Sequence, residues 1–547
     1  MPLKKLTYLL YKKGTNNCYT SFEVPKKNQE TRVISVPNED LKEIKRKLAD
    51  LLYKKQSEIW QQNNISSNIS HGFEKGKGII SNSAIHRNKR FVLNVDLKDF
   101  FDSFHFGRVR GYFHHNKHFK LDIETATIIA QLTCFNGVLP QGAPTSPIIT
   151  NLICQILDFK LLNIAKKYKL DYTRYADDLT FSTNDKKFLR NKDIFLTEVS
   201  KVIEKSGFRI NEKKTRLQYR DSKQTVTGLV VNKKINVDSA YFRETRAMAH
   251  SLYTKGEFVI DGKSGTIHQL EGRFSFINQI DKYDNQNCTE KMRNVFSLNK
   301  REREYQKFLF YKYFISYEKP LIITEGKTDV IYLKAALKNL HEKYPNLIEK
   351  KSDGNFNYKV LFLKRSKKLN YFFQYTLDGA DSINNLYSYY IGEKINGFQC
   401  PDFNVIFNKY GTKAINPVII IFDNEIDSGK EKPIRKFKGY KKLSAEKKQH
   451  LKSDLKIKLI NDGNFFLVTN SLIKGQVESE IEDLFMQETL DVEIDGRKFN
   501  RKVEKGDSAH YGKDIFSKYI FENYKKIDFK NFIPLLDKIN SIVDEYN

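Results

Sequence analysis

Residues 173–182 read Thr173-Arg174-Tyr175-Ala176-Asp177-Asp178-Leu179-Thr180-Phe181-Ser182. Two short runs of β-forming residues flank an acidic pair, which is typical of a hairpin with Asp177 and Asp178 at its turn. Because the flanking residues are apolar and aromatic, we expect buried strands, on which adjacent carboxylates repel each other unless a cation neutralises them. Most isolated Asp-Asp pairs are solvated turns, so a third acid decides between the two interpretations.

That third acid is Asp96, which ends an alternating apolar run at residues 91–96. Transfer of a nucleotide uses two Mg²⁺ ions about 3.5–4 Å apart, and Mg²⁺ prefers carboxylate and phosphate oxygens. Asp96 at one strand end, with Asp177 and Asp178 on a neighbouring hairpin, would supply such ligands. The three acids therefore predict a two-metal site for nucleotidyl transfer.

Two further motifs accompany the acids. Residues 137–147 form a Gly- and Pro-rich loop that opens an apolar helical run at 148–162, and glycine in such a loop lets the backbone approach a ligand closely. The basic segment 207–215, which contains Lys214, follows the hairpin. In this order the four motifs resemble the palm of reverse transcriptases, which are RNA-directed DNA polymerases.

The resemblance implies a role for each matched residue. Asp96 and Asp177 would bridge the metals while Asp178 supports them, and Lys214 would protonate or neutralise the leaving pyrophosphate. Phe101 would close on the sugar 2′-position and exclude ribonucleotides, although core packing also suits it, and a solvated surface charge also suits Lys214. The remaining residues that the resemblance assigns to nucleotide or template binding are Lys98, Gln141, Gly142 and Tyr175.

Composition and charge narrow the function classes. The chain has 547 residues and a net charge of +28, which a polyanionic partner explains better than solubility alone. Five scattered cysteines without a Cys-x-x-Cys motif argue against zinc ribbons, disulfide frameworks and export. The N-terminal apolar run is too short for a signal peptide, and apolar stretches such as 418–422 are strand-sized and cannot span a bilayer. We therefore expect a cytoplasmic protein with no membrane partner.

Two shorter motifs narrow the resemblance to the reverse transcriptases of bacterial retrons. The segment Asn82-Ser83-Ala84-Ile85-His86 approximates the retron signature Asn-Ala-x-x-His, with Ser83 in place of alanine. The triplet Val226-Thr227-Gly228 matches one that precedes the thumb in retron enzymes. The resemblance implies that Asn82, His86 and the triplet help to recognise a cognate noncoding RNA; His86 is equally interpretable as a structural residue that caps a loop.

The resemblance to retron enzymes covers residues 1–315. It implies that the basic loop 70–78 contacts template, and that a basic, aromatic helix at about 290–314 grips a duplex within a thumb at 239–315. Neither an acidic cluster like that of RNase H nor a Cys/His-bearing HNH motif follows the thumb. A retroviral enzyme or a group II intron protein is therefore disfavoured.

A second α/β pattern begins after residue 320. Continuous apolar strands at 321–324 and 418–422 end in Glu325 and in Asp423-Asn424-Glu425, which indicates a parallel sheet covered on both faces, with acids where such sheets bind ligands. This resembles a TOPRIM domain, the metal-binding fold of topoisomerases, primases and some nucleases, although the second motif there reads Asp-x-Asp. The candidate ligands for Mg²⁺ or Mn²⁺ are Glu325, Asp329, Asp423, Glu425, Asp427 and Glu482, of which Glu325, Asp423 and Glu425 would be catalytic. The other interpretation is an acidic rim that only binds or scaffolds.

The predicted architecture is a multidomain α/β protein: a right-hand polymerase with fingers, palm and thumb, followed by a Rossmann-like TOPRIM domain. The expected parts are fingers and palm at 1–238, thumb at 239–315, TOPRIM at 316–490 with an insertion near 341–416, and a helical segment at 491–547.

The family resemblance also implies a mechanism. The enzyme would bind a structured noncoding RNA, prime from a guanosine 2′-hydroxyl, and use dNTPs to copy part of that RNA into multicopy single-stranded DNA. A host RNase H would assist, the TOPRIM domain would act as a nuclease or toxin in antiphage defence, and homo-oligomerisation stays open. Two alternatives are a template-general reverse transcriptase with a non-catalytic binding module, and a scaffold whose TOPRIM fold recruits a separate toxin.

Overall fold

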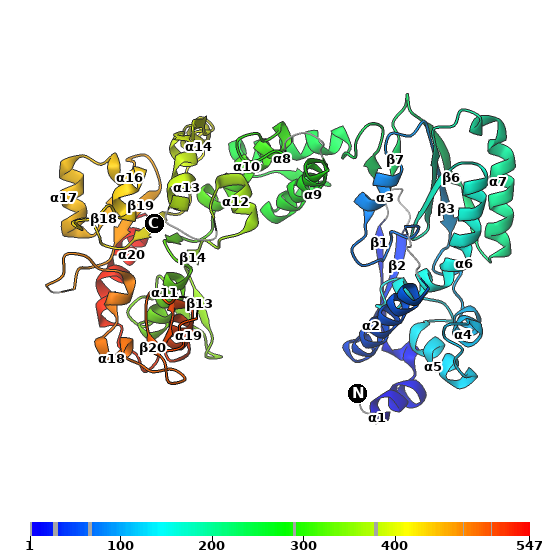
Figure 1. Cartoon of the computed structure of the whole chain (residues 1–547), viewed down its shortest axis with the longest axis horizontal. Coiled ribbons are helices and arrows are strands. Elements are labelled where there is room, and N and C mark those ends of the chain that lie inside the picture. The colour runs from blue at the N-terminus through cyan, green and yellow to red at the C-terminus, as the bar shows by residue number, and fades with distance from the viewer. Residues whose placement is uncertain are drawn as a thin grey trace. The chain divides into compact units, whose positions relative to one another are not determined.

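The computed structural model describes residues 3–25, 31–63, 68–287, 292–376, 381–473, 475–504 and 506–546. The chain divides into two compact units, residues 1–239 and 240–547 (Figure 1). The division lies next to the expected boundary between palm and thumb.

The centre of the first unit is a four-stranded antiparallel sheet in the order β4-β5-β3-β6. Its strands are β3 (Phe91–Lys98), β4 (Asp171–Tyr175), β5 (Asp178–Thr183) and β6 (Arg209–Tyr219). Strands β4 and β5 form the hairpin that the sequence predicts. Alternate residues of the sheet, such as Leu93, Val95 and Phe181, are buried in one core with helices α6 (Ser146–Lys167) and α7 (Phe188–Lys205).

Helix α6 is longer than the expected run at 148–162. It is the one helix, among the residues that the structure describes, that is long and apolar enough to cross a membrane, which the sequence analysis overlooked. Both faces of α6 carry buried residues, and 61% of its most apolar window is buried inside the protein. Its apolar character is therefore accounted for by packing in the palm core.

The fingers comprise a hairpin and helices that precede the palm motifs. The side chain of Asn38 caps the long helix α2 by accepting a hydrogen bond from the backbone N–H of Leu41. The elements of the first unit outside the central sheet are α1 (Leu3–Thr7), η1 (Tyr8–Lys13), η2 (Thr15–Cys18), β1 (Tyr19–Pro25), β2 (Thr31–Pro37), α2 (Glu39–Gln62), α3 (Ile79–Ile85), α4 (Phe106–His115), α5 (Ile123–Thr133), β7 (Thr225–Val226) and β8 (Leu229–Val230).

The second unit begins with the helices of the expected thumb. They are α8 (Ser239–Lys255), α9 (Ile267–Gln286), α10 (Lys300–Phe310) and the short η3 (Tyr311–Ile315), with a small β9–β10 hairpin (Val259–Ile260 and Lys263–Ser264) between the first two. Part of the expected helix at 290–314, including Glu290, lies outside the described residues. From residue 300 onward most of this segment is buried, and two of its cations bind within the unit, Arg301 to Asp281 and Lys312 to Glu271. The expected nucleic-acid-binding face is therefore reduced to exposed residues such as Lys300 and Arg303.

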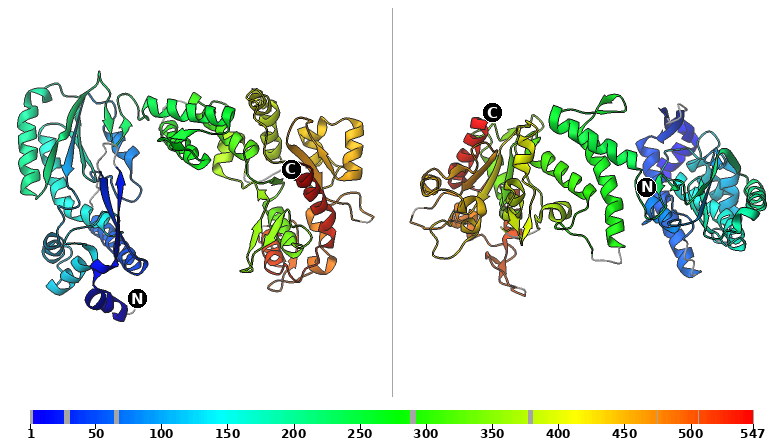
Figure 2. Two further views of the ribbon diagram at one scale, coloured as in Figure 1. Left: turned by 180° about the vertical axis from the view of Figure 1, so that it is seen from behind. Right: turned by 90° about the horizontal axis from the view of Figure 1, so that it is seen from above.

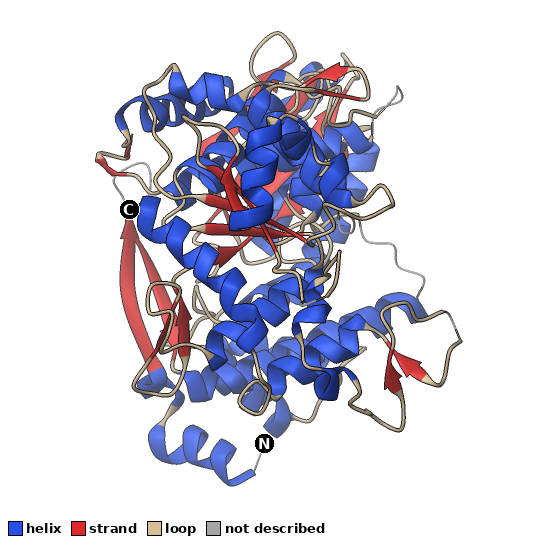
Figure 3. Cartoon of the chain, turned by 90° about the vertical axis from the view of Figure 1, so that its left-hand side faces the viewer, coloured by secondary structure: helices blue, strands red, loops and turns tan. Residues whose placement is uncertain are grey.

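A five-stranded sheet in the order β14-β11-β17-β19-β18 follows. Strands β14 (Leu361–Phe362), β11 (Leu321–Thr324), β17 (Val418–Phe422) and β19 (Phe465–Thr469) are parallel, as predicted, and β18 (Lys456–Lys458) is antiparallel. Its two faces enter different cores: Ile323 and Ile420 face the core that contains the thumb helices, whereas Ile322 and Ile419 face the core of the C-terminal helices. Helices cover both faces (Figures 2 and 3).

The expected insertion at 341–416 connects the thumb helices to this sheet. Gln306 of α10 donates a hydrogen bond to the carbonyl of Phe372 (2.6 Å), and Lys368 forms an ion pair with Glu271 of α9 (3.0 Å). One hydrophobic core therefore runs from the thumb helices through the insertion to the sheet. The elements of this region are α11 (Lys327–Asn339), β12 (Ile348–Lys350), β13 (Phe356–Tyr358), α12 (Lys367–Phe373), α13 (Asp381–Ile391), β15 (Lys394–Ile395), β16 (Phe398–Gln399) and α14 (Phe403–Asn408).

The rest of the second unit consists of short elements and two longer C-terminal helices, and α20 packs against β19. These elements are α15 (Pro433–Lys436), α16 (Lys438–Lys441), α17 (Ala445–Asp454), η4 (Ile481–Leu484), α18 (Gln487–Leu490), β20 (Lys498–Phe499), β21 (His510–Tyr511), α19 (Lys513–Glu522), η5 (Lys530–Phe532) and α20 (Ile533–Tyr546).

Candidate active sites

The three candidate aspartates of the palm lie on neighbouring strands. Asp96 of β3 is the register partner of Asp178 on β5, and the N–H of Leu97 donates to the carbonyl of Asp177 (2.9 Å). The turn that carries Asp177 contains Ala176 in the left-handed region (φ 55°). The pairing therefore brings Asp96 to two carboxylates that lie more than 80 residues further along the sequence.

The electrostatics of these carboxylates reflect their crowding. Burial, followed by the charges of Asp177 and Asp96, raises the pKa of Asp178 to about 6. Burial also raises the pKa of Asp177, with a further contribution from Asp96. Lys214 opposes this repulsion with an ammonium 3.1 Å from Asp96; burial lowers its pKa, but its bonding to Asp96 outweighs this and raises the pKa overall. Lys214 therefore stays charged at neutral pH.

A buried ion pair fixes the base of the catalytic hairpin, and sequence reasoning missed it. Arg174 of β4 is fully buried and binds Asp158 of α6 with two hydrogen bonds of 2.8 Å, while the hydroxyl of Tyr172 donates to the same carboxylate. The available signal was an arginine in the middle of a strand that was expected to be buried, because such a charge requires a partner.

The loop at 70–74 also supports the hairpin, through backbone hydrogen bonds to β4 and through close packing against the turn. The N–H of His71 donates to the carbonyl of Arg174, and the N–H of Arg174 donates to the carbonyl of Ile69 (both 2.8 Å). Gly72 lies so close to the turn that an added Cβ would be 2.6 Å from the backbone nitrogen of Ala176. This part of the loop expected to contact template is therefore a structural support.

The expected nucleotide- and template-binding residues are distributed around the palm. Gly142 has φ 111° and packs against the fingers strand β2, and the carbonyl of Gln141 accepts a hydrogen bond from the N–H of Ser35 (2.8 Å). Phe101 is half-buried, and its ring contacts Phe100 edge-on. Among the other residues expected to bind nucleotide or template, Tyr175 is half-buried and Lys98 is exposed.

The two retron-like motifs meet each other inside the first unit. The hydroxyl of Ser83 donates to the carbonyl of Val226 (3.0 Å), and Thr227 lies 3.4 Å from the same hydroxyl. Asn82 and His86 are fully buried, and both bond to Thr173 of β4, so neither side chain reaches a bound RNA.

Direct RNA contact by Asn82 and His86 is thus incompatible with this structure, which favours the structural interpretation of His86. Val226 is also buried, in a small cluster with Val92 and Val231. In the triplet, only Gly228 is exposed.

A second group of acids lies at the carboxyl edge of the five-stranded sheet. Glu325 follows β11 and accepts a hydrogen bond from the N–H of Asp423, which follows β17 (3.1 Å). The carboxylate of Asp423 accepts from Asn470 and from the N–H of Ile481 (both 2.9 Å), and that of Asp329 accepts from the N–H of Gly326. Burial raises the pKa of Glu325, Asp329 and Asp423, and for Glu325 and Asp423 the neighbouring acids raise it further.

The remaining expected acids have cationic partners. Glu425 pairs with Lys432 (2.6 Å), and the fully buried Glu482 pairs with Lys513 of α19 (3.0 Å). Asp427 is also ion-paired, with Lys452 of α17, but it differs from Glu425 and Glu482 because its carboxylate is exposed at the surface. The expectation that Asp427 joins the ligand set is therefore not supported. Sequence reasoning missed Lys513, which belongs to a segment without a motif.

Neither site holds a converged set of metal ligands. Within the described ranges, no three His, Cys, Asp or Glu side chains form a group that could hold a metal ion. The chemistry of the donors nonetheless fits Mg²⁺ at both places, because crowded carboxylates with raised pKa values are hard oxygen ligands whose repulsion a divalent cation relieves.

Comparisons with known proteins agree with the palm. The family model described as reverse transcriptase (RNA-dependent DNA polymerase) matches residues 24–237. The retron Ec86 reverse transcriptase of Escherichia coli is 33% identical over 293 residues, which cover 53% of this chain and 83% of that protein. The retron Mx162 reverse transcriptase of Myxococcus xanthus is 33% identical over 299 residues, covering 48% of this chain and 58% of that one.

The solved structures that align with this chain share less sequence identity with it than the two retron proteins do. Telomerase from Candida albicans in complex with a fragment of telomeric RNA aligns with 13% identity and a TM-score of 0.33, covering 57% of this chain and 62% of that one. A foamy viral protease–reverse transcriptase with double-stranded DNA aligns with 14% identity and a TM-score of 0.27, covering 54% and 43%.

Proposed function

Because this chain belongs to the retron reverse transcriptase family, we propose that it copies a cognate noncoding RNA into multicopy single-stranded DNA, primed from a guanosine 2′-hydroxyl of that RNA. The observation that carries the proposal is the set of Asp96, Asp177 and Asp178 on paired strands, in a chain with net charge +28. The bacterial cytoplasm, a host RNase H and the dNTP substrates belong to the same proposal.

In this proposal each of the palm residues has a separate role in nucleotide transfer. Asp96 and Asp177 would hold Mg²⁺, which would supply Lewis-acid activation for attack by the hydroxyl and for departure of pyrophosphate. Arg174 and Asp158 hold the acidic turn in place through their buried ion pair. Lys214, which stays protonated, neutralises or protonates the leaving group.

The half-buried ring of Phe101 packs edge-on against Phe100. For the accessible part of this ring we propose a role in excluding ribonucleotides at the sugar 2′-position.

The proposal is tested by asking whether the enzyme copies its own noncoding RNA in preference to a foreign primer–template. Protein purified from its native bacterium is freed of bound nucleic acid and then given either its own noncoding RNA or a foreign primer–template. We expect DNA covalently joined to the cognate RNA through a 2′,5′ linkage. Robust synthesis on the foreign primer–template alone would instead support the alternative, a template-general reverse transcriptase.

For the second unit we propose a TOPRIM-like nuclease that acts as the effector in antiphage defence, with Mg²⁺ or Mn²⁺ held by Glu325 and Asp423. What supports this is the cluster of buried acids at the carboxyl edge of a parallel sheet, where such sheets bind ligands. The matches to the two retron proteins extend over about half of the chain, so this assignment rests on the second unit's own geometry.

Glu325→Gln and Asp423→Asn test the nuclease. Each change removes a hard ligand without removing volume, so we expect normal DNA product together with loss of toxicity and of phage protection. Full protection by both variants with normal DNA product would instead support the interpretation as a binding platform or a scaffold for a separate toxin.

A further inference from the structure

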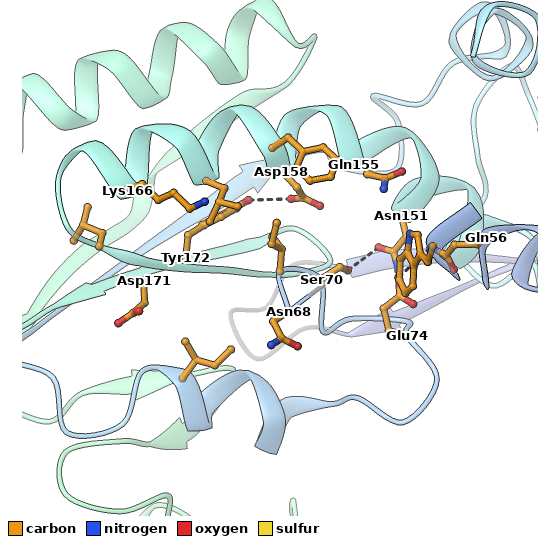
Figure 4. A pocket seen from close by; sticks show the side chains of 16 residues that line it. Gln56, Asn68, Ser70, Glu74, Asn151, Gln155, Asp158, Lys166, Asp171 and Tyr172 are labelled. Carbon is orange, nitrogen blue, oxygen red and sulfur yellow. Dashed lines mark hydrogen bonds between the residues drawn. The ribbon is translucent and has the colours of Figure 1, made fainter. Parts of the chain in front are cut away.

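A cavity of about 480 Å³ lies on the side of the palm formed by α6 and the edge strand β4 (Figure 4). Its walls come from α2, the loop before α3, α6 and β4, and its volume is within the range of about 300–1,000 Å³ that is usual for small-ligand sites. Trp60, Phe159 and Tyr172 provide aromatic surface. None of the proposed metal-, nucleotide- or template-binding residues lines it, although Asp158, which supports the catalytic hairpin, does.

The inner wall of the cavity is a closed hydrogen-bond network. Asn151 accepts hydrogen bonds from Ser70 (3.1 Å) and Arg174 (3.2 Å), and its amide N–H₂ donates to Glu74 (3.0 Å). The carboxylate of Asp158 is neutralised by Arg174. Glu74 accepts hydrogen bonds from the amides of Gln56 and Asn151, and its carboxylate would repel an anionic ligand. Among the described residues, the inner wall therefore offers an anionic ligand no unpaired cation.

Nearer the opening, several polar groups have no protein partner. Gln155 of α6 is half-buried, and Asn68 lies across the cavity from it (Figure 4). Within the part of the chain that the structure describes, no hydrogen bond engages the side chains of Gln155, Asn68 or the indole N–H of Trp60. Amides on opposite walls present both donors and acceptors, and an indole adds a flat surface.

We propose that this cavity binds a single unstacked nucleobase of the RNA that the enzyme copies. The inference rests on the proposed function, because it assumes that RNA binds to the first unit. An uncharged, flat ligand with donors and acceptors along its edge matches the amide pair and the aromatic wall, as in the usual recognition of splayed-out RNA bases. Lys166 also lines the cavity, where a cation would meet the backbone phosphate attached to the base.

Other ligand classes fit less well. A free phosphate or nucleotide would need several cations in the cavity, and Lys166 is the one unpaired basic residue among its described lining residues. A purely apolar ligand would cover the half-buried side chain of Gln155 without offering it a hydrogen-bond partner.

Trp60 makes the proposal measurable, because it is the only tryptophan of the chain and it lines this cavity. Full-length protein is titrated with a short single-stranded RNA, with an abasic ribose-phosphate strand of equal length, and with the four free ribonucleosides. RNA binding is followed separately by the anisotropy of a label on the RNA. We expect RNA and at least one nucleoside to quench Trp60 emission to saturation, and the abasic strand to leave it unchanged.

A matched pair of variants locates the effect. Gln155→Leu removes the amide at nearly constant volume, and we expect a roughly fivefold weaker midpoint of nucleoside quenching from the lost hydrogen bonds. Gln61→Leu makes the same change at an exposed position next to Trp60 that does not line the cavity, and should leave the midpoint unchanged.

RNA that binds by anisotropy without affecting Trp60, or equal quenching by the abasic strand, would overturn the proposal and leave the polymerase assignment standing. A fall in quenching that is equal in both variants would overturn it as well. Absence of any RNA binding would overturn both.

Discussion

The buried pair of Arg174 and Asp158 supports the chemistry without taking part in it. Both side chains are almost fully buried and bonded twice to each other. Asp158→Ala would leave a buried guanidinium without a counter-ion, so we expect a loss of about 3–5 kcal/mol in the free energy of unfolding of the first unit. Denaturant unfolding followed by Trp60 fluorescence measures it.

The surface pair of Lys167, at the end of α6, and Glu198 of α7 is the matched control. Glu198→Ala should cost far less stability than Asp158→Ala, because water replaces most of the interaction at the surface. Equal small losses in the two variants would show that the buried pair is not what stabilises the hairpin.

His86 gives the first unit a predictable acid sensitivity. Burial lowers the pKa of His86 to about 3, whereas in the unfolded chain a histidine titrates near about 6.5. Below that value the unfolded state takes up a proton that the folded state does not, so stability is lost as pH falls from about 6.5 towards about 3. At pH 5 the loss is roughly 2 kcal/mol, since each pKa unit is about 1.36 kcal/mol.

The check compares the free energy of unfolding at neutral pH and at pH 5 for the wild type and for His86→Asn, again by Trp60 fluorescence. The variant should lose most of the pH dependence, whatever its absolute stability. An unchanged pH difference would mean that other groups cause the acid sensitivity.

At this scale the sequence identified some roles and missed others, for a physical reason. Asp96, Asp177 and Asp178 could be found because their chemistry requires acids at strand ends, and strand ends are visible in a hydrophobic pattern. Asp158 and Lys513 were not found, because each acts through a partner on another element; for Asp158 the one available signal was the need of the buried Arg174 for a counter-ion. Asn82 and His86 were assigned to RNA by resemblance alone, and burial was not visible from their spacing.

Among the elements, the loop beneath the catalytic turn is the most constrained. An added Cβ at Gly72 would be 2.6 Å from the backbone nitrogen of Ala176, so Gly72→Ala must displace the turn that carries Asp177. A displacement of about 1 Å in a catalytic group costs on the order of 100-fold in rate. We expect a loss of that size in DNA synthesis, measured by primer extension, with the circular dichroism spectrum preserved.

Gly78→Ala is the control in the same loop, because its backbone is extended and no atom lies within 4 Å of the added Cβ. It should retain nearly full synthesis. Equal activity of the two variants would mean that the turn does not depend on this support.

Helix α10 is the element whose role the sequence did not reveal. The lysines and arginines in and around α10 predict an exposed, duplex-binding face, but acids from α9 and α10 neutralise Arg293 before it, Arg301 within it and Lys312 after it. Ion pairs between different helices leave no recurring pattern in the sequence. The parallel strands of the second sheet are visible as continuous apolar runs, and for this reason they were predicted correctly.

In the whole molecule, the boundary between the two compact units lies after the palm, at residue 239, and not after the thumb. The core of the thumb helices continues through the insertion into the C-terminal sheet, from Ala249 to Leu467. We therefore expect a fragment of residues 1–239 to be soluble and folded, and a fragment of residues 1–320 to aggregate, because the latter exposes the apolar side of α10.

Size-exclusion chromatography and limited proteolysis of the two fragments check this expectation. A monomeric 1–320 fragment with protease-resistant thumb helices would contradict it, and would instead favour a thumb that folds without the second sheet.

The first unit is an RNA-directed DNA polymerase, and its chemistry should depend on the acidic hairpin. Mg²⁺-dependent incorporation of labelled dNTPs on RNA is measured for the wild type and for Asp177→Asn/Asp178→Asn, with Trp60 fluorescence and RNA binding as controls for folding. We expect synthesis by the wild type and none detectable by the variant, which still folds and binds RNA, because two metal ligands are lost at constant volume. Continued primer extension by the folded double variant would contradict it.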